Sequence, residues 1–200
     1  MEEKITFACG EVDLVGLFSR GQNDRGVVVT HPHPLYGGDM FNNVVEAIAR
    51  AYRSRGYATL RFNFRGTGGS SGAYDEGRGE QADVAAALDY LAAAGARRVE
   101  LAGYSFGAWV CARGAARFAA VNRLVLVAPP VVFLDFGDIG PLAKLGLVVS
   151  GSEDELGPPE RVQALLPRWN PRARLAVIED ADHFYFGAEA DLEAEIVRDL

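Results

Sequence analysis

The sequence has few of the residues that build disulfide frameworks and metal sites, with two cysteines and three histidines among its 200 residues. Isolated cysteines in apolar surroundings, such as Cys9 and Cys111, are typical of reduced core residues, so we expect no disulfide and a cytoplasmic protein. His31 and His33 stand two positions apart, each followed by a proline. They lack a clear third ligand, although Asp39 is near, so we expect no metal site.

Excess positive charge and long apolar runs are also missing. The chain carries a formal net charge of −7, which argues against nucleic acid or an anionic membrane as its main partner. No apolar run approaches the roughly 18 residues that span a bilayer. The opening stretch "MEEKITFACGEVDL" is acidic and alternating, so we expect no signal peptide. We expect a small-molecule substrate, no nucleic-acid or membrane partner, and a monomer or homodimer.

A phosphate-binding glycine motif is absent as well. The glycine-rich stretch "RGTGGSSG" at residues 65–72 contains no G-K-[ST], and its spacing does not match G-x-G-x-x-G. We therefore expect neither a P-loop nor a dinucleotide site, and no cofactor. Arg65 in this stretch is expected to steady neighbouring loops, with contact to a polar substrate as the alternative. The acidic residues Asp75, Glu76 and Glu80 are expected to form a solvated loop and a helix start.

What the chain does contain is an ordered alternation of strand and helix patterns. Two segments of period two predict a β-hairpin that turns near Gly10, and apolar runs alternating with helical patterns follow it. This order predicts one domain over residues 1–200, with a mostly parallel sheet covered on both faces and ligands bound beyond the carboxyl ends of its strands. The predicted strands are 4–10, 11–20, 26–32, 57–64, 98–105, 123–130, 145–151 and 174–180, and the predicted helices are 42–56, 79–95, 106–119, 158–169 and 187–200.

The segment "GYSFG" at residues 103–107 matches the pattern G-x-S-x-G between an apolar strand and an apolar helix. A serine on such a sharp turn projects its hydroxyl from the end of the sheet, and the flanking glycines remove side chains that would collide. We predict that Ser105 is a nucleophile. The N–H of Phe106, at the start of the next helix, is the predicted first donor to an oxyanion.

A nucleophilic serine needs a base, and the base needs a carboxylate that orients it. His183 is the only histidine after Ser105, and it follows the last predicted strand. Asp154 follows a buried strand and stands three residues after Gly151, which suits a tight turn. We predict that His183 is the base and Asp154 the acid, with Asp135 as a weaker alternative acid.

These residues carry a resemblance to a known family. The chain resembles the α/β-hydrolase superfamily over essentially its whole length. It is similar to small, lidless bacterial hydrolases in which "HPHPLYGG", "LRFNFRGTGGSSG", "GYSFGA" and "ADHF" occur in this order. The resemblance implies an eight-stranded α/β-hydrolase sheet, a triad of Ser105, Asp154 and His183, and ester hydrolysis. Many relatives carry a bulkier or charged residue where this chain has glycine and serine in "RGTGGSSG".

In this fold the loop after the third strand supplies a second oxyanion donor. Pro32 and Pro34 have no N–H, so the donor must be His33, Leu35 or Tyr36. Relatives with a histidine–glycine pair here use the residue after the pair, which indicates His33, whereas the longer loop of this chain favours Leu35. Both alternatives stay open at this point. The histidine side chains are expected to make structural hydrogen bonds or to line the pocket.

The predicted function is that of a serine hydrolase. Only residues 131–144 separate the sixth and seventh strands, so we expect no lid and an open site for small or extended substrates. We expect a carboxylesterase for small or short-chain acyl esters, acting through an acyl-enzyme. Alternatives on the same triad are a thioesterase, a lactonase, a small-amide hydrolase or an acyltransferase. A non-catalytic binding module that keeps the fold is the alternative from a different class.

Overall fold

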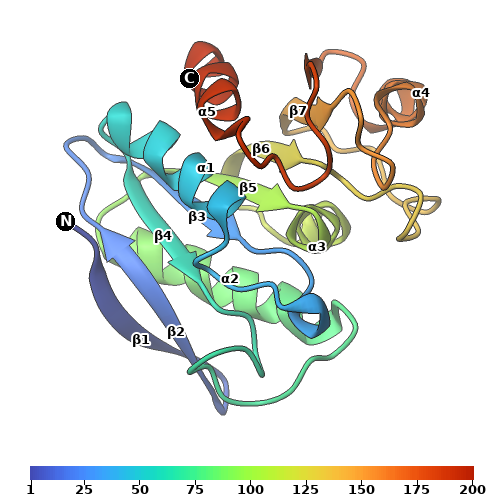
Figure 1. The fold of residues 1–200 in the computed structure, drawn as a ribbon. Helices are drawn as coiled ribbons and strands as arrows, with labels where there is room; N and C mark the ends of the chain where they lie inside the picture. Colours follow the sequence, from blue (N-terminus) through green and yellow to red (C-terminus); the bar gives the residue numbers. More distant parts are fainter.

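The computed structural model describes residues 1–200 and contains one eight-stranded sheet (Figure 1). The strand order is β1-β2-β4-β3-β5-β6-β7-β8. Strands β1, β2 and β4 pair antiparallel in that order, and all other pairs are parallel. The strands are β1 (Glu3–Cys9), β2 (Val12–Ser19), β3 (Arg25–Thr30), β4 (Ala58–Phe62), β5 (Arg98–Tyr104), β6 (Val121–Val127), β7 (Leu145–Gly151) and β8 (Arg174–Ile178).

Five α-helices cover the two faces of the sheet (Figure 1). Helices α2, α3 and α4 share one apolar core with one face, whereas α1 and α5 share a second core with the other face. Burial on both faces explains why the central strands are almost continuously apolar. None of these helices has the length and apolar character needed to cross a membrane. The helices are α1 (Asn43–Ser54), α2 (Arg78–Ala93), α3 (Phe106–Gly114), α4 (Pro159–Trp169) and α5 (Glu189–Asp199), and a 3₁₀ turn, η1, spans Pro34–Tyr36.

The strand order places a crevice beside β3. The chain passes from β3 through α1 to β4 on one side, and then through α2 to β5 on the other side. The order therefore reverses at β3, and in such sheets ligands bind outside the carboxyl ends of the strands at this switch point. The loop after β3 and the turn after β5 both open there.

The order and type of the predicted strands and helices are confirmed, and most of their bounds lie within three residues of the predicted ones, with two larger differences. Helix α3 ends at Gly114 rather than at residue 119, because the ring of Phe118 folds back against Gly114, where a Cβ atom would lie 2.3 Å from it. The turn η1 was not predicted from the sequence. It begins after His33, whose side chain accepts a hydrogen bond from the N–H of Leu35.

Candidate active site

Ser105 lies on a strained turn between β5 and α3. Its φ of 53° and ψ of −118° fall in a region that L residues rarely adopt, at a cost of about 1–3 kcal/mol. The backbone holds this conformation from both sides: the N–H of Ser105 donates to the carbonyl of Val127 at 3.0 Å, and its carbonyl accepts from the N–H of Trp109 at 3.1 Å. The turn presents the serine at the carboxyl end of the sheet.

The glycines on either side of Ser105 are required by close approaches of the backbone. A Cβ on Gly103 would lie 2.6 Å from the carbonyl oxygen of Gly107. A Cβ on Gly107 would lie 2.5 Å from the Thr30 hydroxyl and 2.7 Å from the His31 carbonyl oxygen. The second glycine therefore allows the start of α3 to lie directly against the chain leaving β3.

The structure brings Ser105, His183 and Asp154 together in a hydrogen-bonded chain. The Oγ of Ser105 lies 2.9 Å from Nε2 of His183, and Nδ1 of His183 lies 2.9 Å from both carboxylate oxygens of Asp154. All three residues are buried. Since a carboxylate only accepts hydrogen bonds, the Nδ1 carries the proton of the neutral ring. The Nε2 is then free to accept the proton of the Ser105 hydroxyl.

Backbone contacts fix the acid and the base of this chain. One oxygen of Asp154 accepts the N–H groups of Leu156 at 2.9 Å and Gly157 at 2.8 Å. The hydroxyl of Tyr104, the residue before the serine, donates to the carbonyl of His183 at 2.9 Å. Both the ring and the backbone of His183 are therefore held in place before a substrate binds.

The alternative acid, Asp135, lies elsewhere. Its carbonyl accepts the indole N–H of Trp109 at 2.8 Å, and its carboxylate accepts the N–H of Gly137 at 2.6 Å. The structure pairs His183 with Asp154, the predicted acid, and not with the weaker alternative, Asp135. Asp135 closes its own loop because an aspartate readily accepts from a backbone N–H two residues later.

The backbone N–H groups of Phe106 and of the loop after β3 are the candidate donors to an oxyanion formed at Ser105. Phe106 is the first residue of α3, so its N–H has no acceptor within the helix. In the loop after β3, Leu35 donates to the ring of His33 at 3.2 Å, and Tyr36 donates to the carbonyl of His33 at 3.1 Å. The N–H of His33 makes no hydrogen bond within the protein. The structure therefore favours His33 over Leu35 and Tyr36 as the second donor.

A cleft of about 560 Å³ opens above Ser105. Its walls come from the loops after β3, β5, β6, β7 and β8. The rings of Tyr36 and Phe133, which both line the cleft, meet edge to face with centroids 6.0 Å apart. Both residues are at least half exposed. The aromatic and aliphatic side chains that line the cleft are Pro32, Tyr36, Tyr104, Phe106, Pro130, Phe133, Leu134, Leu156 and Phe184.

His31 is a structural residue, as one of the two expectations for the histidines states. Its Nδ1 donates to the carbonyl of Pro32 at 2.7 Å, and its Nε2 accepts the N–H of Phe64 at 3.0 Å. Complete burial lowers the pKa of His31 to about 4, so the ring is neutral. No three side chains of His, Cys, Asp or Glu are grouped so that they could hold a metal ion.

Several other predicted residues have structural contacts. Arg65 forms a bidentate ion pair with the buried Asp83 of α2, a structural contact that ties the loop after β4 to this helix. Glu80 begins α2 as expected, but it is buried and accepts the N–H of Gly77 at 2.7 Å rather than facing solvent. Both cysteines are free, and Cys111 lies in the core. Cys9 is only half-buried, because it lies on the edge strand β1.

Sequence reasoning missed two tyrosines at the site. Tyr104 is only a variable position of the serine motif in the sequence. In the structure it ends β5, and its hydroxyl donates to the carbonyl of His183 in the loop after β8. Tyr74 lies within a loop that carries no recognised pattern, and its hydroxyl lies 3.3 Å from Nε2 of His33. Only the fold brings Tyr74 and His33 together, since their positions in the sequence differ by 41.

Known proteins share this arrangement of the chain. The family model of the α/β hydrolase fold matches residues 27–146. An uncharacterised protein of Rickettsia prowazekii is 36% identical over 194 residues, which cover 91% of this chain and 82% of that protein. An α/β serine hydrolase homologue from Coxiella burnetii has a solved structure with 35% identity and a TM-score of 0.92, covering 99% of this chain and 97% of that one.

A second solved structure bears on the missing lid. It is an α/β serine hydrolase without a lid from Xanthomonas campestris, with 33% identity and a TM-score of 0.90, covering 99% of this chain and 93% of that one. The short connection between β6 and β7 agrees with that description. With these similarities over nearly its whole length, the chain belongs to the α/β-hydrolase family as a hydrolase of the serine type.

Proposed function

We propose that this protein is a carboxylesterase that acts on small or short-chain acyl esters through Ser105, His183 and Asp154. The observation that carries the proposal is the hydrogen-bonded chain from the serine hydroxyl through the imidazole to a buried carboxylate, with both links at 2.9 Å. A nucleophile, a base and an orienting acid in this geometry are the parts that acyl transfer requires.

The first half of the reaction forms an acyl-enzyme. The Oγ of Ser105 attacks the ester carbonyl carbon while its proton moves to Nε2 of His183, and Asp154 stabilises the imidazolium that results. The carbonyl oxygen becomes an oxyanion, which the N–H groups of Phe106 and His33 bind. The intermediate then collapses: the ester C–O bond breaks, and His183 gives its proton to the leaving alcohol.

The second half regenerates the enzyme. A water molecule loses a proton to His183 and attacks the acyl carbon, and the same two N–H groups bind the second oxyanion. The bond to Oγ breaks, His183 returns the proton to Ser105, and the carboxylic acid leaves. The open, apolar cleft suits a small acyl group, because no lid encloses a long chain.

Hydrolysis of p-nitrophenyl esters from acetate to decanoate tests the proposal. We expect activity that falls with chain length, and a loss of about 10⁴–10⁶ in rate when Ser105 is replaced by alanine. Ser54→Ala, in the last turn of α1, is the matched control and should keep full activity. Ester hydrolysis that persists at the wild-type rate in Ser105→Ala would overturn the assignment.

A fluorophosphonate probe separates the remaining alternatives. Labelling of Ser105 without ester hydrolysis would replace the carboxylesterase by a thioesterase, lactonase, small-amide hydrolase or acyltransferase on the same triad. A protein that is not labelled at Ser105 would be a binding module that keeps the fold.

A further inference from the structure

The imidazole of His33 contacts the backbone of the loop after β3 and the side chain of Phe106, the two places from which the proposed mechanism takes its oxyanion donors. Its Nδ1 accepts the N–H of Leu35 at 3.2 Å, at the start of η1. The face of the ring packs against Phe106, with centroids 4.7 Å apart. A single side chain therefore links the loop after β3 to the first turn of α3.

The hydrogen bonds define the protonation state of this ring. Because Nδ1 accepts a hydrogen bond, the proton of the neutral ring must be on Nε2. Nε2 lies 3.3 Å from the hydroxyl of Tyr74, to which it can donate. Partial burial lowers the pKa of His33, which favours the neutral ring over the charged one.

The His33 carbonyl organises the rest of the loop. It accepts the N–H groups of Tyr36 at 3.1 Å and Gly38 at 3.0 Å, and a Cβ on Gly38 would lie 2.3 Å from the carbonyl oxygen of Pro32. With the ring engaging Leu35 as well, every other N–H from residue 33 to residue 38 has an acceptor. The His33 N–H alone remains for a ligand.

We propose that the His33 side chain is a positioning residue for the oxyanion hole. Its Nδ1 withdraws the Leu35 N–H from the cleft and fixes η1, so that the His33 backbone N–H faces the reacting carbonyl. This inference rests on the proposed function, and it assigns to the imidazole a task separate from proton transfer.

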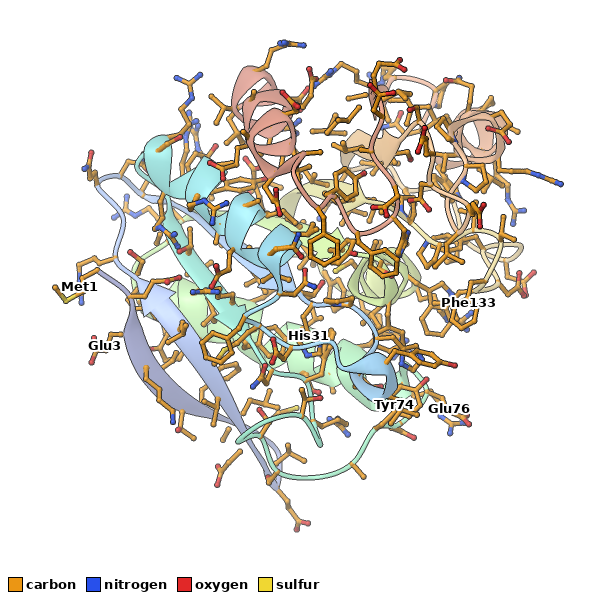
Figure 2. All side chains as sticks on the ribbon, in the orientation of Figure 1. Met1, Glu3, His31, Tyr74, Glu76 and Phe133 are labelled. Atoms are coloured by element: carbon orange, nitrogen blue, oxygen red, sulfur yellow. The ribbon has the colours of Figure 1, made fainter.

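Tyr74 contacts the His33 side chain through its hydroxyl and through its ring, whose centroid lies 5.2 Å from that of the imidazole. Figure 2 shows Tyr74 beside the turn η1, with Phe133 at the same end of the molecule. Its loop is fixed at both ends: Arg65 pairs with Asp83, and Glu80 accepts the N–H of Asp75, the next residue after Tyr74, at 2.9 Å. This anchoring keeps the Tyr74 hydroxyl within reach of Nε2.

A pair of substitutions at His33 tests the inference. His33→Asn keeps an oxygen that can accept the Leu35 N–H, since asparagine is among the best helix N-cap residues, whereas His33→Leu keeps bulk without an acceptor. We expect His33→Leu to lower kcat for p-nitrophenyl acetate and the rate of Ser105 labelling by fluorophosphonate by about 10- to 100-fold, less than the loss of a whole donor. KM should change by no more than about twofold, and His33→Asn should restore most of the rate.

A second variant, with a smaller change than His33→Leu, keeps the test valid if His33→Leu fails to fold. Tyr74→Phe removes only the hydroxyl, and we expect labelling and kcat to fall by about three- to tenfold, the effect of one lost hydrogen bond. Tyr90→Phe, on α2 outside the cleft, is the matched control and should match the wild type.

Two results would overturn the inference while leaving the proposed function intact. One is wild-type labelling and kcat in His33→Leu. The other is equal loss in His33→Asn and His33→Leu, which would reflect packing of the ring alone. Failure of the proposed function has a different signature, because Ser105→Ala would then hydrolyse esters as well as the wild type.

Discussion

The carboxyl ends and the amino ends of the parallel strands form two opposite rims of the sheet, here called the carboxyl edge and the amino-terminal edge. These two edges differ in the residues that they carry. All five non-glycine residues with positive φ lie in connections that leave the carboxyl ends of strands: Glu76, Ser105, Ala128, Asp180 and Tyr185. Seven of the nine large apolar side chains that are exposed lie there too: Leu35, Tyr36, Phe41, Val132, Phe133, Phe184 and Phe186. This edge carries strain and exposed apolar area, both of which cost stability.

The amino-terminal ends of β5 and β6 carry a group of charged residues that pair with one another and with tyrosine hydroxyls. The carboxylate of Glu100 on β5 accepts hydrogen bonds from the hydroxyls of Tyr52 at 2.9 Å and Tyr57 at 3.1 Å. Arg123 on β6 lies 3.8 Å from Glu100 and also pairs with Asp199 at the end of α5. The contrast indicates that the amino-terminal edge stabilises the fold, which allows the other edge to hold groups in strained, reactive positions.

The largest effect is expected at the carboxyl edge, from Asp154→Asn. An amide at this position would favour the wrong tautomer of His183, so kcat/KM for p-nitrophenyl acetate should fall by about 10⁴. Unfolding monitored by circular dichroism should change little, because the side chain volume is kept. Glu153→Gln, on the exposed neighbouring carboxylate, is the control and should keep full activity. A loss below tenfold in Asp154→Asn would contradict the role of this acid.

The next effect concerns His31 and the dependence of stability on pH. The folded-state pKa of about 4 lies below the ordinary value of 6.5, so between these values the unfolded chain binds a proton that the folded chain does not. The contribution of neutral His31 to the free energy of unfolding is therefore complete above pH 6.5. It is lost as pH falls toward 4, by up to about 3 kcal/mol. Urea unfolding at several pH values should show this loss, with a flatter profile in His31→Gln.

An independent check on His31 is direct titration of its ring by NMR. We expect the His31 signals to stay those of a neutral imidazole down to about pH 4.5. A titration midpoint near pH 6.5 in the folded protein would contradict the buried, doubly hydrogen-bonded state described above.

The smallest of these effects is expected at the amino-terminal edge. Glu100→Ala removes the acceptor of two tyrosine hydroxyls, one of them fully buried, and should lower the free energy of unfolding by about 1–3 kcal/mol. The value of kcat/KM should be unchanged, since Glu100 lies at the opposite edge from Ser105. Glu11→Ala in the exposed β1–β2 turn is the control. A loss of activity without loss of stability would contradict the division between the edges.

Sequence patterns predicted most of this arrangement because the relevant signals are local. The order of strands and helices follows from periodicity, and Ser105, Asp154 and His183 each lie within five residues after the end of an apolar strand. The proposed choice of His33 over Leu35 as an oxyanion donor could not be predicted, since it depends on the direction in which the His33 imidazole turns. The contact with Tyr74 and the early end of α3 at Gly114 depend on rings that approach from distant parts of the chain.

The absence of a side chain at Gly107 has a consequence for engineering this protein. Because a Cβ on Gly107 would meet the Thr30 hydroxyl and the His31 carbonyl oxygen, any side chain at position 107 would push α3 away from the chain that leaves β3. Directed evolution toward new acyl groups should therefore find its useful changes among the exposed aromatic residues of the mouth, such as Tyr36 and Phe133. Residues 103–107 would be kept constant in such experiments, and the exposed residues at the opening of the cleft would be varied.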